Sequence, residues 1–386
     1  MSSGPDGAVG RYLELGLRIG KHAPDLIDGF YGPAELAERV DAEEPRDPAA
    51  LAEDAEALRA DAESDRWLAT QVSSLGATAR KLGGEKLSYA EEGQLVYAIV
   101  PRWHDEAAFE RAHEQLDEAL PGDGDLRDRY ARWFDETAIP PELVEPALRD
   151  TATELRRLTR ETVGLPDGED FDLELVTDKP WTGYAHYLGS LRTHIQINTD
   201  LPLPAAELVH LTSHEIYGGH HTHRVWQETE LVNGRGELER TIDLLWSPEA
   251  VLSEGIAQTG PKIVTGGEEQ ALAAEVLGRL GFEFDAEVGA RVDEARWSIS
   301  PVAANVTMLM HDRGGSPEEA RDYARTWSLQ PDRRIDKLVD SMSRTESPVY
   351  MHTYWQGLDL VEGHVRGDAA RFRELLTARV LPADLA

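Results

Sequence analysis

The chain has 386 residues, 41% of them hydrophobic, which is enough for one large domain or two coupled ones with a buried core. It contains no cysteine, so disulfide bonds, cysteine nucleophiles and thiolate metal ligands are excluded. Its formal net charge of −33 is spread along the chain, which argues against nucleic acid as a partner and is typical of a surface adapted to high salt. We therefore expect a halophilic protein.

No stretch approaches the roughly 20 consecutive apolar residues that a membrane-spanning helix needs, so we expect no membrane partner. Residues 1–10 are polar and rich in glycine, and they lack the charged start and apolar stretch of a signal peptide. These features predict a cytoplasmic location. The oligomeric state is not indicated by any of them.

The first part of the chain is predicted to be helical, because apolar residues recur there at helical spacing. The segments concerned are Ala49–Ala62, Tyr89–Val100, Asp105–Leu120 and Pro141–Glu161. Turn-forming residues then cluster in the segment LPDGED, residues 165–170. We place a boundary there, between an N-terminal helical region (1–164) and a second region (165–386), and expect the two to pack closely as one unit.

The second region begins with residues that favour strands. Asp172–Thr177 and Thr193–Asn198 alternate or carry β-branched side chains, and both are predicted to be short strands. The segment WTGYAHYLGS between them is expected to be a hairpin or a loop with a short strand. Helices are predicted to resume at Pro204 and continue to the end. The fold class is therefore mostly α, with a small β-sheet beside the segment described next.

Histidines are concentrated in one segment: five of the 13 lie between positions 210 and 223, in the sequence VHLTSHEIYGGHHTH. His214-Glu215 matches the start of the zinc motif H-E-x-x-H, in which two histidines one helical turn apart bind the metal and the glutamate acts as a base. Glycine occupies position 218, where the second histidine would stand. On an unbroken helix, His220 would point to another side and His221 would lie about 10 Å further along the axis.

Adjacent glycines offer a solution, because Gly218 and Gly219 tolerate conformations that a helix forbids. We expect them to loop out as a bulge and to bring His220 into the position of the missing ligand. Other choices stay open, namely His210 with His214 at spacing i, i+4, His220 with His223 at i, i+3, and His221 as the ligand. A straight helix through residue 223 would favour His210 and His214.

A third ligand is expected from the segment SPEAVLSEGIAQTGP, because a catalytic zinc has three protein ligands and an open position. Ser247 and Pro248 are typical of a helix start, as the cap and the first residue. Glu254 then falls in mid-helix beside Gly255 and Ala257. Small residues on both sides of a carboxylate permit close approach of another helix.

The motifs together resemble the zinc-peptidase-like family called domain of unknown function 885, which is related to the gluzincin peptidases. HEIYGGHH and SEGIA are similar to the family's H-E-x-x-P-G-H and E-G-W-A. MHDRGGSPEEA (310–320) is similar to its H-x-x-G-W-S-x-E-x-A, and the segment from Ser347-Pro348 to Gly357 to its late P-x-Q-x-x-x-Y-x-x-G. The chain departs from the pattern at Gly218, His223 and Ile256, and none of these changes removes a ligand or the base.

The resemblance implies a multi-helical, zincin-like metallopeptidase fold, in which residues 165–386 form the metal-binding catalytic region. It implies one zinc ion per chain, held by His214, His220 and Glu254, with Glu215 as the general base. Tyr354 becomes the candidate for stabilising the oxyanion. We also expect three side chains to contact the substrate: Tyr184, Tyr187 and His352.

The sequence thus predicts a zinc-dependent hydrolase, a peptidase or carboxypeptidase acting on short peptides. Two alternatives remain. The chain could be a non-catalytic relative that binds metal or peptide, although binding alone does not require the base Glu215. It could also hydrolyse an amide or ester that is not a peptide.

Overall fold

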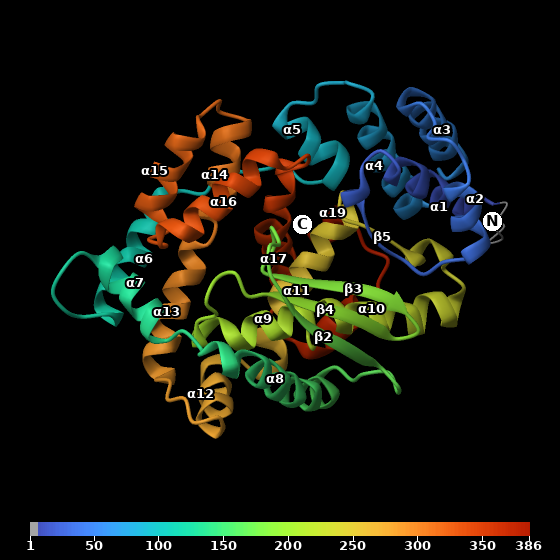
Figure 1. Ribbon diagram of the computed structural model, residues 1–386. Helices are drawn as coiled ribbons and strands as arrows, with labels where there is room; N and C mark the ends of the chain where they lie inside the picture. Colours follow the sequence, from blue (N-terminus) through green and yellow to red (C-terminus); the bar gives the residue numbers. More distant parts are fainter. Residues whose placement is uncertain (1–6) are drawn as a thin grey trace.

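Helices dominate the computed structural model, which describes residues 7–386 (Figure 1). The elements before the central sheet are α1 (Ala8–Gly20), β1 (Ile27–Phe30), α2 (Ala34–Asp41), α3 (Pro48–Asp61), α4 (Arg66–Leu82), α5 (Tyr89–Glu92), α6 (Glu106–Ala119), α7 (Leu126–Glu136) and α8 (Pro141–Thr162). Three of the four predicted helices are confirmed as α3, α6 and α8. Pro48 is the first residue of α3, and the Asp47 carboxylate caps this helix.

The fourth predicted helix, over 89–100, is wrong in its last three residues. α5 ends at Glu92, a single π-helical segment follows to Tyr97, and Ala98 has a left-handed conformation with φ 56°. Val100 precedes Pro101, and a residue before proline disfavours the helical conformation. The chain therefore turns back at Ala98 instead of continuing the helix.

The central sheet has three strands, β2 (Asp170–Val176), β3 (Gly183–Gly189) and β4 (Arg192–Asn198), in the order β2-β4-β3. β4 is parallel to β2 and antiparallel to β3. Both predicted strands are confirmed, and the segment between them supplies β3. This strand forms a hairpin with β4 through Ser190 and Leu191, whose φ angles are 56° and 57°.

A second, two-stranded sheet joins distant parts of the chain, because β1 pairs with β5 (Ile242–Leu244). The remaining helices are α9 (Leu208–Glu215), α10 (His220–Trp226), α11 (Pro248–Thr265), α12 (Glu269–Arg279), α13 (Ala286–Ile299), α14 (Val302–His311), α15 (Pro317–Trp327), α16 (Asp332–Arg344), α17 (Met351–Val365), α18 (Ala369–Leu375) and α19 (Pro382–Leu385). No helix within 7–386 has the length and apolar character needed to cross a membrane.

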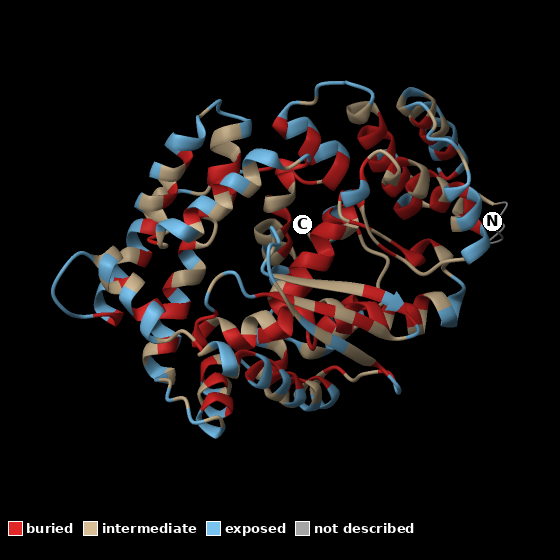
Figure 2. Ribbon diagram, in the orientation of Figure 1, coloured by how far each residue is buried: buried red, intermediate tan, exposed pale blue. Residues whose placement is uncertain are grey.

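Helix α11 runs through the interior and is buried along most of its length (Figure 2). It crosses α17 at two glycines: a Cβ atom on Gly255 would lie 2.3 Å from the carbonyl oxygen of Gly357, and one on Gly357 would lie 2.2 Å from that of Val251. Only glycine permits backbones to approach so closely. The close helix approach expected beside Glu254 is therefore present.

Four clusters of buried apolar side chains make up the core of the described residues. Each cluster combines residues from both sides of position 164, as in the pairs Leu75 and Trp246, Phe109 and Val306, and Leu148 and Ile197. The helices before the sheet thus share their cores with the helices after it.

Candidate metal centre

The histidine-rich segment is not a straight helix. α9 ends at Glu215 and α10 begins at His220, so residues 216–219 separate two helices. Gly218 has φ +104°, and a Cβ atom on Gly219 would lie 1.9 Å from the carbonyl oxygen of His214. The expected interruption at the two glycines is found, but it spans four residues and divides the helix instead of bulging from it.

Hydrogen bonds across the interruption fix its shape. The Ser213 hydroxyl donates to the carbonyl oxygen of Tyr217 at 2.7 Å, and the amide of Gly218 donates to Thr222 Oγ1 at 2.9 Å. The amide of Thr222 donates to the carbonyl oxygen of Ile216 at 3.1 Å. Polar backbone groups released by the helix end are thus satisfied locally, and α10 starts in a defined direction.

This direction brings three potential metal ligands together. His214 Nε2 lies 3.5 Å and His220 Nε2 lies 3.9 Å from Glu254 Oε2. One ligand atom from each of the three residues lies within 4.8 Å of the others, and no other group of three or more His, Asp or Glu within 7–386 is arranged in this way. Helices α9, α10 and α11 each contribute one of these side chains.

The bonding state of these groups fits a divalent cation. Glu254 Oε1 accepts a hydrogen bond from the Tyr350 hydroxyl at 2.6 Å, whereas Oε2 is buried without a partner. Burial, opposed by the Tyr350 hydrogen bond and reinforced by nearby carboxylates, raises the pKa of Glu254 to about 8. Because a buried carboxylate oxygen without a donor is costly, a cation between it and two imidazoles would stabilise the cluster.

Both histidines are held in the form that binds metal. Burial lowers the pKa of His214 well below its usual value and that of His220 to about 3, so both rings are neutral. His220 Nδ1 lies 3.3 Å from Ser253 Oγ, which leaves Nε2 directed at Glu254. A hydrogen bond at the second ring nitrogen is the usual way to orient a metal-binding histidine.

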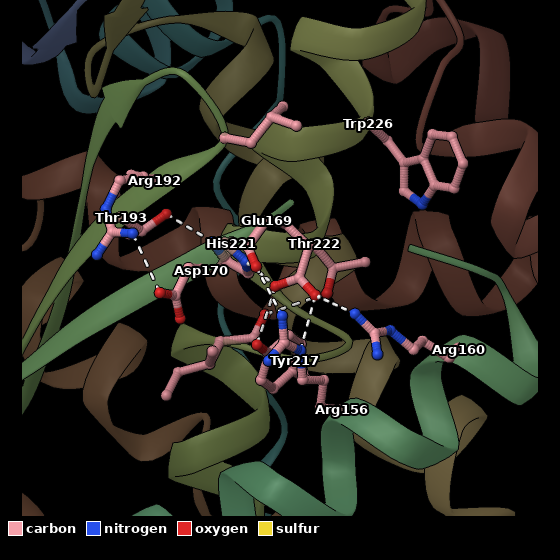
Figure 3. Close-up of polar contacts among 12 residues, drawn as sticks. Arg156, Arg160, Glu169, Asp170, Arg192, Thr193, Tyr217, His221, Thr222 and Trp226 are labelled. Carbon is pink, nitrogen blue, oxygen red and sulfur yellow. Dashed lines mark hydrogen bonds and ion pairs between the residues drawn. The ribbon is translucent and has the colours of Figure 1, made fainter. Parts of the chain in front are cut away.

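His221 points to another side of α10 than His220, into a buried polar network. Figure 3 shows its ring against Glu169, whose Oε2 lies 3.2 Å from His221 Nε2, while the other ring nitrogen lies 2.7 Å from Thr193 Oγ1. Both ring nitrogens of His221 therefore have hydrogen-bond partners. The fully buried Glu169 side chain also accepts hydrogen bonds from Tyr217, Arg156 and Arg160. This network, which we call the Glu169 network, braces the interruption between α9 and α10.

The two other histidines of the segment also have partners outside the cluster. His210 Nε2 lies 3.0 Å from Gln258 Oε1, and its ring packs on Trp297. His223 Nε2 accepts a hydrogen bond from the side-chain amide of Gln227 at 2.9 Å. Of the five histidines, only His214 and His220 face Glu254.

Glu215 lies beside the cluster and opposite the edge of the sheet. Burial, together with the charges of Glu254 and Asp28, raises its pKa well above the usual value. A Cβ atom on Gly183 of β3 would lie 2.3 Å from Glu215 Oε1, so the carboxylate occupies the space that a side chain would fill. Glycine at position 183 thus admits the carboxylate to the cavity.

Two of the four remaining predicted site residues line the cavity at the cluster, and two do not. Tyr184 and Tyr354 line it, and the Tyr354 ring stacks 6.2 Å from that of His214. Tyr187 lies three positions after Tyr184 on β3, so it points to the other face of the sheet, where its hydroxyl donates to Glu228. His352 is fully buried against Tyr89. The expected substrate contacts of Tyr187 and His352 are therefore corrected.

The cavity also contains side chains that sequence reasoning missed. Asp28, Trp181, Arg224 and Asp243 all line it, as does Tyr350, which the sequence offered as a further candidate for the oxyanion donor after Tyr354. The first four belong to no recognisable motif, because they come from β1, from the segment before β3, from α10 and from β5. Trp181 and Gly183 stand in the segment between the two predicted strands, and this position was the one sequence feature that could have pointed to the cavity.

Comparisons with known proteins show a related fold and no family. No family model and no curated protein matches the chain. A solved structure described as a "putative lipoprotein" from Colwellia psychrerythraea has a TM-score of 0.54 at 15% identity, over 91% of this chain and 64% of that one. A "putative lipoprotein of unknown function" from Shewanella oneidensis has a TM-score of 0.50 at 12% identity, over 89% and 70%.

At such identities the likeness concerns the fold alone. The chain spans about 64% of the length of the Colwellia protein. Membership of the domain of unknown function 885 family, the zincin-like class of the fold and the cytoplasmic location all stay predictions.

Proposed function

We propose that the chain is a zinc-dependent hydrolase that cleaves peptide bonds in short peptides, with a zincin-like fold of the domain of unknown function 885 type. The observation that carries the proposal is the unpartnered Oε2 of Glu254, which is buried beside two neutral imidazoles. His214, His220 and Glu254 hold one zinc ion per chain. Three protein ligands leave a catalytic zinc an open position. A bound zinc ion supplies a Lewis acid that polarises a carbonyl group and lowers the pKa of water.

Three residues of the chain supply the remaining catalytic and positioning roles. Glu215 takes the proton of the attacking water on a carboxylate oxygen and passes it to the leaving amine. The Tyr354 hydroxyl donates a hydrogen bond to the oxyanion, an interaction typically worth roughly 3–4 kcal/mol. Tyr350 holds Oε1 of Glu254 and so keeps Oε2 for the ion.

The test separates metal binding from proton transfer. Glu215→Gln should retain one zinc per chain and lose hydrolysis of short peptides by roughly 100-fold or more, since a general base typically contributes that much. Tyr187→Phe is a matched control outside the cavity and should keep its turnover. Unchanged turnover in Glu215→Gln would refute the mechanism.

The second candidate is a protein that binds metal or peptide without catalysis. The position of Glu215, in the cavity and against Gly183, favours the hydrolase. Full zinc occupancy in the wild type without turnover of any peptide, simple amide or ester would favour the binding protein. Turnover of a non-peptide amide or ester alone would keep the mechanism and change the substrate class.

A further inference from the structure

Two cavities meet at the proposed metal centre. One has a volume of about 180 Å³ and the other of about 460 Å³. The residues that line both are Trp181, Gly183, His214, Glu215 and Tyr354. A substrate cleaved at this junction therefore has one part in the small cavity and the other in the large one.

Strand β1 borders the small cavity at the edge of the sheet, where Asp28 lines it. The carbonyl oxygen of Asp28 lies 2.7 Å from His186 Nδ1 and accepts a hydrogen bond from the Tyr184 hydroxyl at 3.4 Å. A Cβ atom on Gly29 would lie 3.2 Å from the carbonyl oxygen of Tyr187, so the backbones of β1 and β3 are in contact. Since pockets for drug-sized ligands span roughly 300–1,000 Å³, this smaller cavity accepts only a short end of a substrate.

The charged side chains of the small cavity indicate which end of a substrate it accepts. Its one arginine, Arg224, is ion-paired with Asp243 and lies 3.7 Å from Glu249. Asp28 lines the same cavity, and its buried Oδ1 has no hydrogen-bond partner. Four carboxylates line the cavity: Asp243 pairs with the arginine, Glu215 and Glu254 belong to the proposed metal centre, and Asp28 remains without an ion-pair partner. A cationic group would satisfy it, whereas a carboxylate would be repelled.

The cations that line the large cavity are ion-paired with carboxylates. Its lining includes three cations, Arg296, Arg334 and Lys337, and one carboxylate besides the base Glu215, namely Glu207. The other carboxylates paired with these cations, Asp293 and Asp200, do not line the cavity. Arg296 pairs with Asp293, Arg334 with Glu207 and Lys337 with Asp200. The carboxylate of Asp28, which has no such partner, is therefore the charge that distinguishes the two ends of the cleft.

We propose that Asp28 binds the free α-amino group of the substrate, and that the chain is an aminopeptidase that removes one residue from short peptides. This inference rests on the proposed function and defines its substrate class. Water is split across the first peptide bond: its oxygen joins the acyl carbon of the N-terminal residue, and its proton goes to the nitrogen that leaves. The carboxylate end of the peptide extends into the large cavity towards Arg334 and Lys337.

A binding experiment tests this subsite without requiring turnover. Tri-alanine, N-acetyl-tri-alanine and tri-alanine amide are titrated calorimetrically into the zinc-loaded Glu215→Gln chain at fixed ionic strength. Acetylation should weaken binding at least 10-fold, and amidation should weaken it less. Asp28→Asn should bring the free and acetylated peptides to equal affinity, whereas Asp25→Asn, the same change on an exposed neighbour, should leave the difference intact.

The outcomes separate the subsite from the hydrolase. Equal binding of free and acetylated peptide, or no binding of either, overturns the amine subsite even if Asp28→Asn cannot be purified. Equal cleavage of both peptides by the wild type also overturns it and leaves the hydrolase standing. A 10-fold preference for the free amine in a chain that cleaves no peptide supports the subsite and refutes the proposed hydrolysis.

Discussion

Gly260 of α11 packs directly against Gly218, because a Cβ atom on Gly260 would lie 2.0 Å from the Gly218 carbonyl oxygen. The helix that carries Glu254 is thus in contact with the interruption that directs His220 towards the same site. We predict that Gly260→Ala lowers the free energy of unfolding by about 1–3 kcal/mol, as overpacked interiors do, and weakens zinc binding. Chemical denaturation and a competitive zinc titration measure the two effects.

Gly363→Ala is the matched control for this change. Gly363 lies in α17 with nothing within 4 Å of an added Cβ atom, so alanine should stabilise the helix by roughly 0.5–1 kcal/mol. A Gly260→Ala chain as stable as Gly363→Ala, with unchanged zinc affinity, would show that the contact with Gly218 does not position the site.

The Glu169 network predicts a positioning effect at a distance from the metal. Glu169→Gln removes the charge shared by Arg156, Arg160 and His221, and should cost about 1–3 kcal/mol of stability because the side chain is buried. Zinc affinity should fall as well, because Tyr217 and His221 connect the Glu169 network to the interruption between α9 and α10. Glu161→Gln, at an exposed pair with Arg157, should change stability by less than about 0.5 kcal/mol. A loss of stability with unaltered zinc affinity would confine the network to a structural role.

His352 provides a prediction about pH. Burial, with smaller effects of His104 and Arg102, lowers its pKa to about 3, and neither ring nitrogen has a hydrogen-bond partner. The folded state thus binds fewer protons than the unfolded state, whose histidine has a pKa near 6.5. The stability contribution is complete above pH 6.5 and is lost as the pH falls towards 3.

His352→Phe keeps an aromatic ring against Tyr89 and removes both unpartnered nitrogens. We expect a gain of about 1–3 kcal/mol at neutral pH and a shallower fall of the unfolding free energy below pH 6, measured by denaturation across a pH series. Peptide turnover should be unchanged. A large loss of turnover with intact stability would restore His352 as a substrate contact.

Charge predicts a dependence on salt. With a net charge of −33, repulsion within the folded chain is screened as the ionic strength rises. The melting temperature should therefore rise steadily between about 0.1 and 2 M potassium chloride. Over this range the screening length falls from roughly 10 Å to about 3 Å or less. A melting temperature that is independent of salt would contradict the halophilic interpretation.

The local features of the site were predictable from sequence because their causes are local. The start of α11 at Ser247 and Pro248 follows from capping preferences, and the Ser247 hydroxyl accepts the amide of Ala250 as expected. The interruption after Glu215 follows from two adjacent glycines. Only its extent, four residues instead of two, required the structure.

The parts that were missed depend on distant contacts. Asp28 reaches the cavity because β1 pairs with β5 and contacts β3, and no local pattern signals this pairing. Tyr187 and His352 were assigned by proximity in sequence, although alternation along β3 and the packing of α17 turn them away from the cavity. The end of the helix that begins at Tyr89 reflects Pro101, which disfavours a helical conformation at Val100.

The most direct test is the zinc content of the purified chain, measured by plasma mass spectrometry after dialysis in high salt. We predict one zinc per chain in the wild type and in His210→Ala, and almost none in His220→Ala or Glu254→Ala, with all four proteins folded by circular dichroism. A folded wild type that neither contains nor takes up zinc, or variants at His220 and Glu254 that keep it, would contradict the metal centre.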